Sequence, residues 1–400
     1  MVGWKAFGEP LNVTHFSNWG KAMIHIRHAL FVTFILVAVV EGALGQGVGL
    51  EKVDATKLFN QDVALSNPLR VEQVKELDRY IKFLASDSSR FQKLFSPDYS
   101  SVERFEKSAE PLRKAFSESI GYPPPGDRPK SPATFQQIGE DAIGVYYRAM
   151  IPILPEVYSE GIYIVPKSLR GKAPLVVAMH GGGGSPEVAL FHGGANYHDM
   201  VRGGVKRGYI VYAPQHLFRA DGYPEDIRRQ IDDRLRLVGT SITAVEIAKI
   251  TFALDELIKR DEVDASRIAM VGLSYGGYYA QVTPALDTRI KVSVSSCYFG
   301  VQEFRYEKDE LSIPTDFRFM NRLTLFNDAD LVALICPRAH QIQAGATDNA
   351  SHREKGKELA PRAGNFYQKL NLSDRFQHVI FEGGHEFDDE SAWQFVAKHL

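Results

Sequence analysis

The sequence lacks the features that mark several specialised classes of protein. Only two cysteines occur among its 400 residues, so a disulfide framework and a cysteine-rich metal site are both excluded. The net charge of −2 provides no strongly basic surface, and we therefore expect no nucleic-acid partner. Hydrophobic residues make up 44% and charged residues 24% of the chain, which is the usual balance for a globular protein with a large core.

The two cysteines are not expected to bond to each other. Cys297 should lie at the far end of one strand, and Cys336 just before the near end of the next parallel strand. Since a strand typically spans about 17–20 Å and disulfide-bonded Cα atoms lie less than about 7 Å apart, both thiols should be free.

Long hydrophobic runs are scarce, and the notable one lies near the N-terminus. Ala29–Val40 contains twelve residues without charge, which is too short to span a membrane. It suits the core of a signal peptide within residues 1–45, with translation starting at Met23 and cleavage near Gly45–Gln46. A short buried helix or an uncleaved anchor is the alternative. We expect a secreted or periplasmic protein with no stable membrane span after signal cleavage.

The remaining chain divides into an extension and a larger domain. We expect residues 46–125 to form a helical N-terminal extension and linker, and 126–400 to form the larger domain. A stripe of apolar residues at helical spacing within the extension predicts a helix that packs against the domain; its positions are 71, 74, 77 and 81. The Gly- and Pro-rich stretch 121–126 ends the extension.

The larger domain alternates short apolar segments with helical patterns such as 242–259. This alternation predicts the α/β class, with a mostly parallel, eight-stranded, doubly wound sheet and a site at the carboxyl ends of its strands. The expected strands are 142–150, 158–165, 174–179, 209–213, 267–272, 290–296, 339–345 and 378–382.

Ser274 is the candidate nucleophile. It lies in the sequence Gly-Leu-Ser-Tyr-Gly at 272–276, after an apolar strand and before the helical pattern 277–282. A serine at a sharp strand-to-helix turn exposes its hydroxyl, and glycines two residues to either side leave room for the turn. The pattern alone is weak, but the strand and helix around it support the assignment.

A serine hydroxyl needs a base and an orienting acid to become a nucleophile. Asp348 follows the strand 339–345 and is the candidate acid, whereas His385 follows the last strand and is the candidate base. Four other aspartates are less suitable, because two precede a strand and two lie too near His385 in the sequence: Asp328, Asp330, Asp388 and Asp389.

A glycine run provides a candidate oxyanion hole. The strand 174–179 ends in a histidine followed by Gly181–Gly184. Glycines let backbone N–H groups approach a developing negative charge, so Gly182 or Gly183 should donate one hydrogen bond and Tyr275 N–H the other. No Gly-Lys-Ser/Thr follows the glycines, which argues against a phosphate-binding loop.

These motifs, together with 138–141, 146–148, 161–166, 180–187 and 334–338, resemble the α/β-hydrolase superfamily, in particular bacterial dienelactone-hydrolase and acetyl-xylan-esterase relatives. The resemblance covers residues 110–400 and implies the α/β-hydrolase fold. The sequence around Ser274 also resembles prolyl-oligopeptidase-type peptidases, but there is no room for their propeller domain and no blade-length repeat.

The pattern predicts a serine carboxylic-ester hydrolase that works by two-step acyl transfer without a metal or organic cofactor. Its substrate would be a small-molecule ester or an acylated polysaccharide. The alternatives are a prolyl-oligopeptidase-like peptidase and a non-catalytic binding relative. Two long connections, 214–239 and 298–333, should shape the pocket. The first carries arginines that would either hold an acidic substrate such as a uronate or form a solvated face: Arg219, Arg228, Arg229, Arg234 and Arg236.

Overall fold

The computed structural model describes residues 67–192, 196–307 and 315–400. The expected signal peptide, the start at Met23 and the first part of the extension lie outside the described residues. Among the described residues, Glu76–Leu400 form one compact unit, and Asn67–Lys75 belong to a separate one. Within the described ranges, no single helix is both long and apolar enough to cross a membrane.

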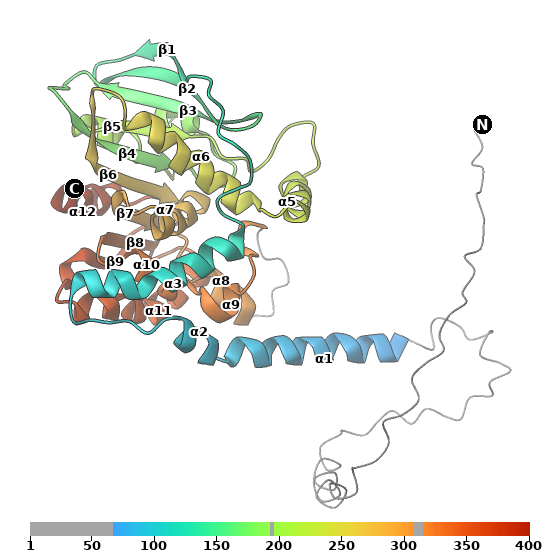
Figure 1. Ribbon diagram of the computed structural model, residues 1–400. Coiled ribbons are helices and arrows are strands. Elements are labelled where there is room, and N and C mark those ends of the chain that lie inside the picture. The colour runs from blue at the N-terminus through green and yellow to red at the C-terminus, as the bar shows by residue number, and fades with distance from the viewer. Residues whose placement is uncertain (1–66, 193–195, 308–314) are drawn as a thin grey trace, which may run out of the picture. The chain divides into compact units, whose positions relative to one another are not determined.

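A nine-stranded sheet forms the centre of the unit Glu76–Leu400 (Figure 1). The strand order is β1-β2-β3-β5-β4-β6-β7-β8-β9. In this spatial order, the three neighbouring pairs β1–β2, β2–β3 and β3–β5 are antiparallel. The five remaining pairs, from β5–β4 to β8–β9, are parallel, as predicted for an α/β protein. The strands are β1 Thr134–Glu140, β2 Gly144–Leu154, β3 Val157–Pro166, β4 Ala173–Met179, β5 Ile210–Pro214, β6 Val263–Leu273, β7 Ile290–Ser296, β8 Ala339–Gly345 and β9 Phe376–Phe381.

The prediction of eight strands was short by one. The eight expected strands are present with shifted ends, but β1 was missed. Its sequence, TFQQIGE, is largely polar, and none of its residues is buried. An edge strand with little burial carries no apolar pattern from which it could be recognised.

Helices cover both faces of the sheet (Figure 1). The helices of the described residues are α1 Asn67–Ser86, α2 Ser89–Leu94, α3 Val102–Ile120, the π-helix η3 Val188–His192, α4 Arg202–Lys206, α5 Ile227–Leu237, α6 Ile242–Leu257, α7 Tyr275–Leu286, α8 Val301–Glu307, the 3-10 helix η4 Thr315–Phe317, α9 Arg322–Leu325, α10 Asp328–Ile335, α11 Ala350–Lys369, the 3-10 helix η5 Ser373–Arg375 and α12 Asp389–His399.

Strand β4 shows how the two faces are filled. All seven of its residues are buried, and successive side chains point to opposite faces. Leu175 and Val177 pack in one core with residues of α3, α6, α7, α10 and α11. Val176 and Ala178 pack in a second core with residues of α12. A strand buried on both faces requires a continuous apolar run, and this is why β4 could be recognised in the sequence.

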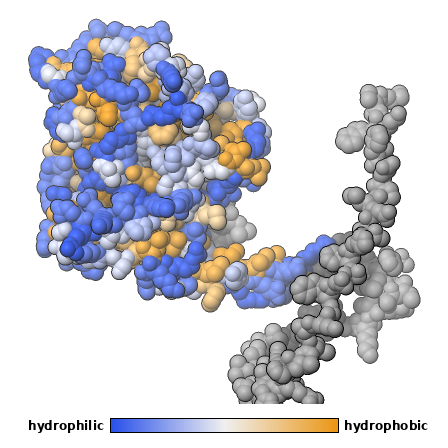
Figure 2. Space-filling model, viewed as in Figure 1, coloured by the Kyte–Doolittle hydropathy of each residue, from blue (hydrophilic) through white to orange (hydrophobic). Residues whose placement is uncertain are grey.

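The helices of the N-terminal extension differ in how deeply they are buried. In α3, Phe105, Leu112 and Phe116 are fully buried in the first core. In α1, no residue is buried, and Leu77 is 62% exposed. The apolar stripe thus predicted a helix correctly, and Ile81 of that stripe lines a cavity together with Phe319 and Leu323. The surface view shows apolar residues on α1 (Figure 2).

The arginine-rich connection 214–239 contains α5, which is held by a buried ion pair. Arg228 donates from Nε to Asp316 Oδ1 at 2.7 Å, and Asp316 also accepts from the Tyr279 hydroxyl. Burial alone would raise the pKa of the Asp316 carboxyl, but Arg228 lowers it. The Arg228 side chain is only 5% exposed, so it stabilises the folded structure and is not part of a solvated face. The pair ties α5 to η4.

We predict that Arg228→Met lowers the free energy of unfolding by about 3–5 kcal/mol, because it leaves the Asp316 carboxylate buried without its cation. Arg229 is the matched control, because it pairs with Asp226 at the surface and its side chain is 55% exposed. Arg229→Met should leave stability unchanged. Denaturant unfolding measures both, and equal stabilities for the two variants would contradict the assigned role of the buried pair.

Candidate active site

Ser274 lies at the turn between β6 and α7. Its backbone has φ 60° and ψ −115°, a conformation that residues other than glycine rarely adopt. The Ser274 N–H donates to Ser296 O on the neighbouring strand at 2.8 Å, which holds the turn against β7. Backbone strain of this kind persists only where the surroundings fix it, and it is common at functional sites.

The glycines around Ser274 are required by backbone contacts. A Cβ atom on Gly272 would lie 2.2 Å from Gly276 O, and one on Gly276 would lie 2.0 Å from Met179 O at the end of β4. A Cβ on Gly277 would lie 2.4 Å from Ser296 O. The turn is therefore packed directly on the ends of both strands that flank β6.

The acid and base candidates lie after the next two strands. Asp348 follows β8, and His385 follows β9. His385 Nδ1 lies 3.0 Å from Asp348 Oδ2 and 3.2 Å from Oδ1. Burial alone would raise the pKa of the Asp348 carboxyl, but the hydrogen bond from His385 and the nearby His352 and His385 rings lower it. Asp348 is therefore ionised at neutral pH and can hold the imidazole Nδ1–H.

The competing aspartates have other partners. Asp328, at the start of α10, accepts from Tyr298 OH at 3.0 Å and from Gly300 N–H at 2.7 Å. Asp330 forms an ion pair with Arg362. No hydrogen bond joins either carboxylate to His385 among the described residues.

Ser274 and His385 line one cavity of about 230 Å³. Within the described residues no hydrogen bond joins the Ser274 hydroxyl to His385; in unliganded sites this contact is often long and tightens when substrate binds. The other residues that line the cavity are Tyr275, Cys297, Tyr298, Val301, Arg305, Phe317, Asn349, Ser351 and His352.

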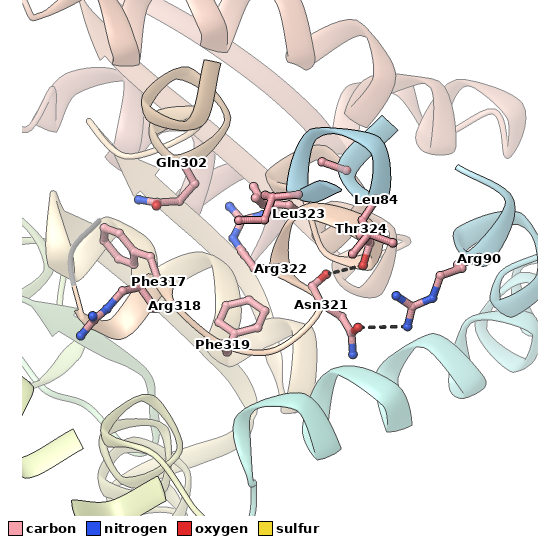
Figure 3. Close-up of a pocket in the computed structure, with 12 residues that line it drawn as sticks. Leu84, Arg90, Gln302, Phe317, Arg318, Phe319, Asn321, Arg322, Leu323 and Thr324 are labelled. Carbon is pink, nitrogen blue, oxygen red and sulfur yellow. Dashed lines mark hydrogen bonds between the residues drawn. The ribbon is translucent and has the colours of Figure 1, made fainter. Parts of the chain in front are cut away.

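Figure 3 shows a larger cavity, of about 390 Å³. Gln302, Arg318, Phe319 and Arg322 are among its lining residues, and Phe317 contributes to both cavities. It contains neither Ser274 nor His385. The smaller cavity, where the candidate nucleophile and base are found, is therefore the candidate active site.

The glycine loop after β4 lies beside Ser274. A Cβ on Gly181 would be 3.3 Å from Ser274 Cβ, but the Gly181 N–H already donates to the Tyr197 hydroxyl at 2.9 Å. The N–H groups of Gly182 and Gly183 have no hydrogen-bond partner within the described residues. Tyr275 is the first residue of α7, where N–H groups lack partners inside the helix.

Sequence reasoning missed the residues that hold the loop. The rings of His180 and His216 stack with centroids 4.2 Å apart, and His216 Nε2 bonds to His180 O at 3.0 Å. Burial lowers the pKa of His180 to about 3 and that of His216 to about 4, so both rings are neutral. These residues follow β4 and β5, but only the fold places the two strands side by side.

Hydrogen bonds of the next two residues stabilise the turn that carries His385. Glu386 Oε1 accepts from Gly384 N–H at 3.0 Å, and Glu386 Oε2 lies 2.8 Å from His198 Nε2. The Phe387 N–H donates to Asn196 O at 2.8 Å. These bonds join the turn to residues 196–198, and nothing in the sequence indicated them.

One group of side chains near the site could hold a metal ion. The ligand atoms of Cys297, Asp348 and His385 all lie within 4.8 Å of one another, the only such cluster among the described residues. Both cysteines are free and buried, in agreement with the sequence prediction.

No family model matches the chain. YtaP of Bacillus subtilis (strain 168), which is named as a hydrolase, is 26% identical over 234 residues, covering 56% of this chain and 76% of that protein. A Bacteroides fragilis NCTC 9343 structure named as an acetyl xylan esterase aligns with a TM-score of 0.59 and 17% identity, covering 72% of this chain and 80% of its own.

Two further solved structures are similar. Methylesterase BT1017 aligns with a TM-score of 0.59 and 18% identity, over 79% of this chain and 68% of its own. A glucuronoyl esterase from Solibacter usitatus aligns with a TM-score of 0.51 and 16% identity, over 73% of this chain and 93% of its own. With the sheet order and the strained serine turn, these similarities show that the chain has the α/β-hydrolase fold and resembles bacterial acetyl xylan esterases and related esterases.

Proposed function

We propose that this protein is a serine hydrolase that cleaves carboxylic esters by two-step acyl transfer. The observation that carries the proposal is the arrangement in one cavity of Ser274, at a strained strand-to-helix turn, and His385, which is hydrogen-bonded to Asp348. A weak nucleophile, a base and a group that orients the base are the three parts that acyl transfer needs.

In the first step, His385 accepts the proton of Ser274 while the hydroxyl oxygen attacks the ester carbonyl. Asp348 holds the imidazole in the correct tautomer and stabilises its charged form. The N–H groups of Tyr275 and of Gly182 or Gly183 donate to the oxyanion. The alcohol leaves with a proton from His385, and water then repeats the sequence on the acyl-enzyme. These steps use protein groups and water alone.

The size of the cavity supports an ester in which the acyl group or the alcohol is small. Sites for drug-sized ligands enclose about 300–1,000 Å³, whereas the cavity at Ser274 has about 230 Å³. One structure similar to this chain is named as an acetyl xylan esterase and another as a methylesterase. An acetylated or methyl-esterified polysaccharide is therefore the proposed substrate class, and the signal-like residues 1–45 fit an extracellular or periplasmic location.

Ser274→Ala tests the nucleophile. The wild-type protein should hydrolyse short aryl esters and acetylated xylan, and the variant should lose about 10⁴-fold or more in kcat, because no other group supplies the attacking oxygen. Release of nitrophenol and of acetate measures the two activities. Wild-type cleavage of dipeptide naphthylamides without ester cleavage would favour a peptidase, and equal rates for variant and wild type would contradict the proposal.

Asp348→Asn tests the acid. The amide cannot hold the imidazole in the required tautomer, and we expect a loss of about 10⁴-fold in kcat with little change in KM. Asp388→Asn is the matched control, because Asp388 is an aspartate only three residues from His385 in the sequence but its carboxylate accepts from Ser391. The control should keep most of the activity. A larger loss in the control than in Asp348→Asn would reverse the assignment.

A further inference from the structure

The thiol of Cys297 lies beside the candidate acid and base. Cys297 follows β7, Asp348 follows β8 and His385 follows β9, so three adjacent parallel strands deliver the three side chains to one edge of the sheet. Their ligand atoms lie within 4.8 Å of one another. The proposed acyl transfer uses Asp348 and His385 and gives Cys297 no role.

We propose that Cys297, Asp348 and His385 form a site for one thiophilic divalent cation of the Zn²⁺ or Cd²⁺ type, and that the bound ion inhibits the enzyme. The inhibitory part rests on the proposed function, whereas the binding part does not.

The ligand set matches such an ion in chemistry and charge. Thiolate and imidazole select soft and borderline cations over Mg²⁺ and Ca²⁺. One thiolate and one carboxylate supply two negative charges, so the bound ion would be neutralised in a site where Cys297 is fully buried and the Asp348 side chain is 2% exposed.

The geometry needs only a small adjustment. Zinc lies about 2.3 Å from sulfur and about 2.0–2.2 Å from nitrogen and oxygen, which places tetrahedral ligands about 3.4–3.6 Å from one another. His385 Nδ1 and Asp348 Oδ2 are already 3.0 Å apart. Since no pair of ligand atoms exceeds 4.8 Å, closing the site requires movements of about 1 Å.

The backbone directs the thiol, and the cavity gives access to it. Cys297 has φ 52°, and its N–H donates to Gln343 O at 2.9 Å, which ties the strained residue to β8. The Cys297 thiol donates to Glu386 O, with 3.3 Å between Sγ and the oxygen. Cys297 and His385 both line the cavity at Ser274, so an ion can reach the ligands by the route that the substrate would use.

The proton balance explains the inhibition. Binding converts the thiol to a thiolate and releases its proton to solvent. At His385 the ion replaces the proton on Nδ1, and Nε2 becomes the protonated nitrogen. A ring protonated at Nε2 has no lone pair with which to accept the Ser274 proton.

The experiment titrates Cd²⁺ or Zn²⁺ into the full chain with short aryl esters as substrate. Cys336 is the other buried cysteine, and Cys336→Ser is therefore the control. Wild type and Cys336→Ser should be inhibited at the same metal concentration, and both should recover their activity after a chelator is added. Cys297→Ser should need at least about tenfold more metal for half-inhibition, because one of three ligands is lost. Equal inhibition of Cys297→Ser and wild type, or no inhibition of wild type, would overturn the proposal.

A second measurement does not depend on turnover. Cd²⁺ bound to Ser274→Ala should give an ultraviolet thiolate-to-cadmium absorption band that Ser274→Ala/Cys297→Ala lacks and that Ser274→Ala/Cys336→Ser keeps. The band would appear even if the protein hydrolysed no ester, so failure of the proposed function and failure of the metal site give different results. Absence of the band in folded Ser274→Ala would overturn the proposal.

Discussion

Close backbone contact between the Ser274 turn and the end of β4 is the constraint on which the candidate site depends. A Cβ on Gly276 would lie 2.0 Å from Met179 O, so only glycine lets α7 begin directly against that strand. The same contact brings the glycine loop after β4 beside Ser274, with Gly181 near the Ser274 side chain. The nucleophile and the candidate oxyanion hole are thus positioned by one packing event in the backbone, before any substrate is bound.

Much of the fold and the candidate triad could be predicted, because both depend on patterns that survive in a linear sequence. A strand buried on both faces must be apolar throughout, as β4 is, and such runs are visible without a structure. The carboxyl ends of parallel strands meet at one edge of the sheet, so residues that follow β6, β8 and β9 are expected to converge. Asp348 and His385 are indeed hydrogen-bonded, and Ser274 lines the same cavity as His385.

Other features depend on contacts between distant parts of the chain and leave no local pattern. β1 is a polar edge strand defined only by its pairing with β2. Arg228 resembles its exposed neighbours in the sequence, and its burial follows from Asp316, which lies 88 residues away. The stripe on α1 has the spacing of a packed helix, yet spacing alone cannot say whether a partner covers it. No local pattern relates Cys297 to Asp348, whereas the fold places the two side chains together.

The most direct test of the central claim is covalent labelling of the folded chain with a serine-directed fluorophosphonate, followed by mass spectrometry of its peptides. The account predicts one stoichiometric adduct, located on Ser274, because the proposed mechanism assigns His385 and the glycine loop to that hydroxyl. It also predicts that Ser274→Ala remains unlabelled. Absence of an adduct in the wild-type protein, or an adduct on a different serine, would contradict the account.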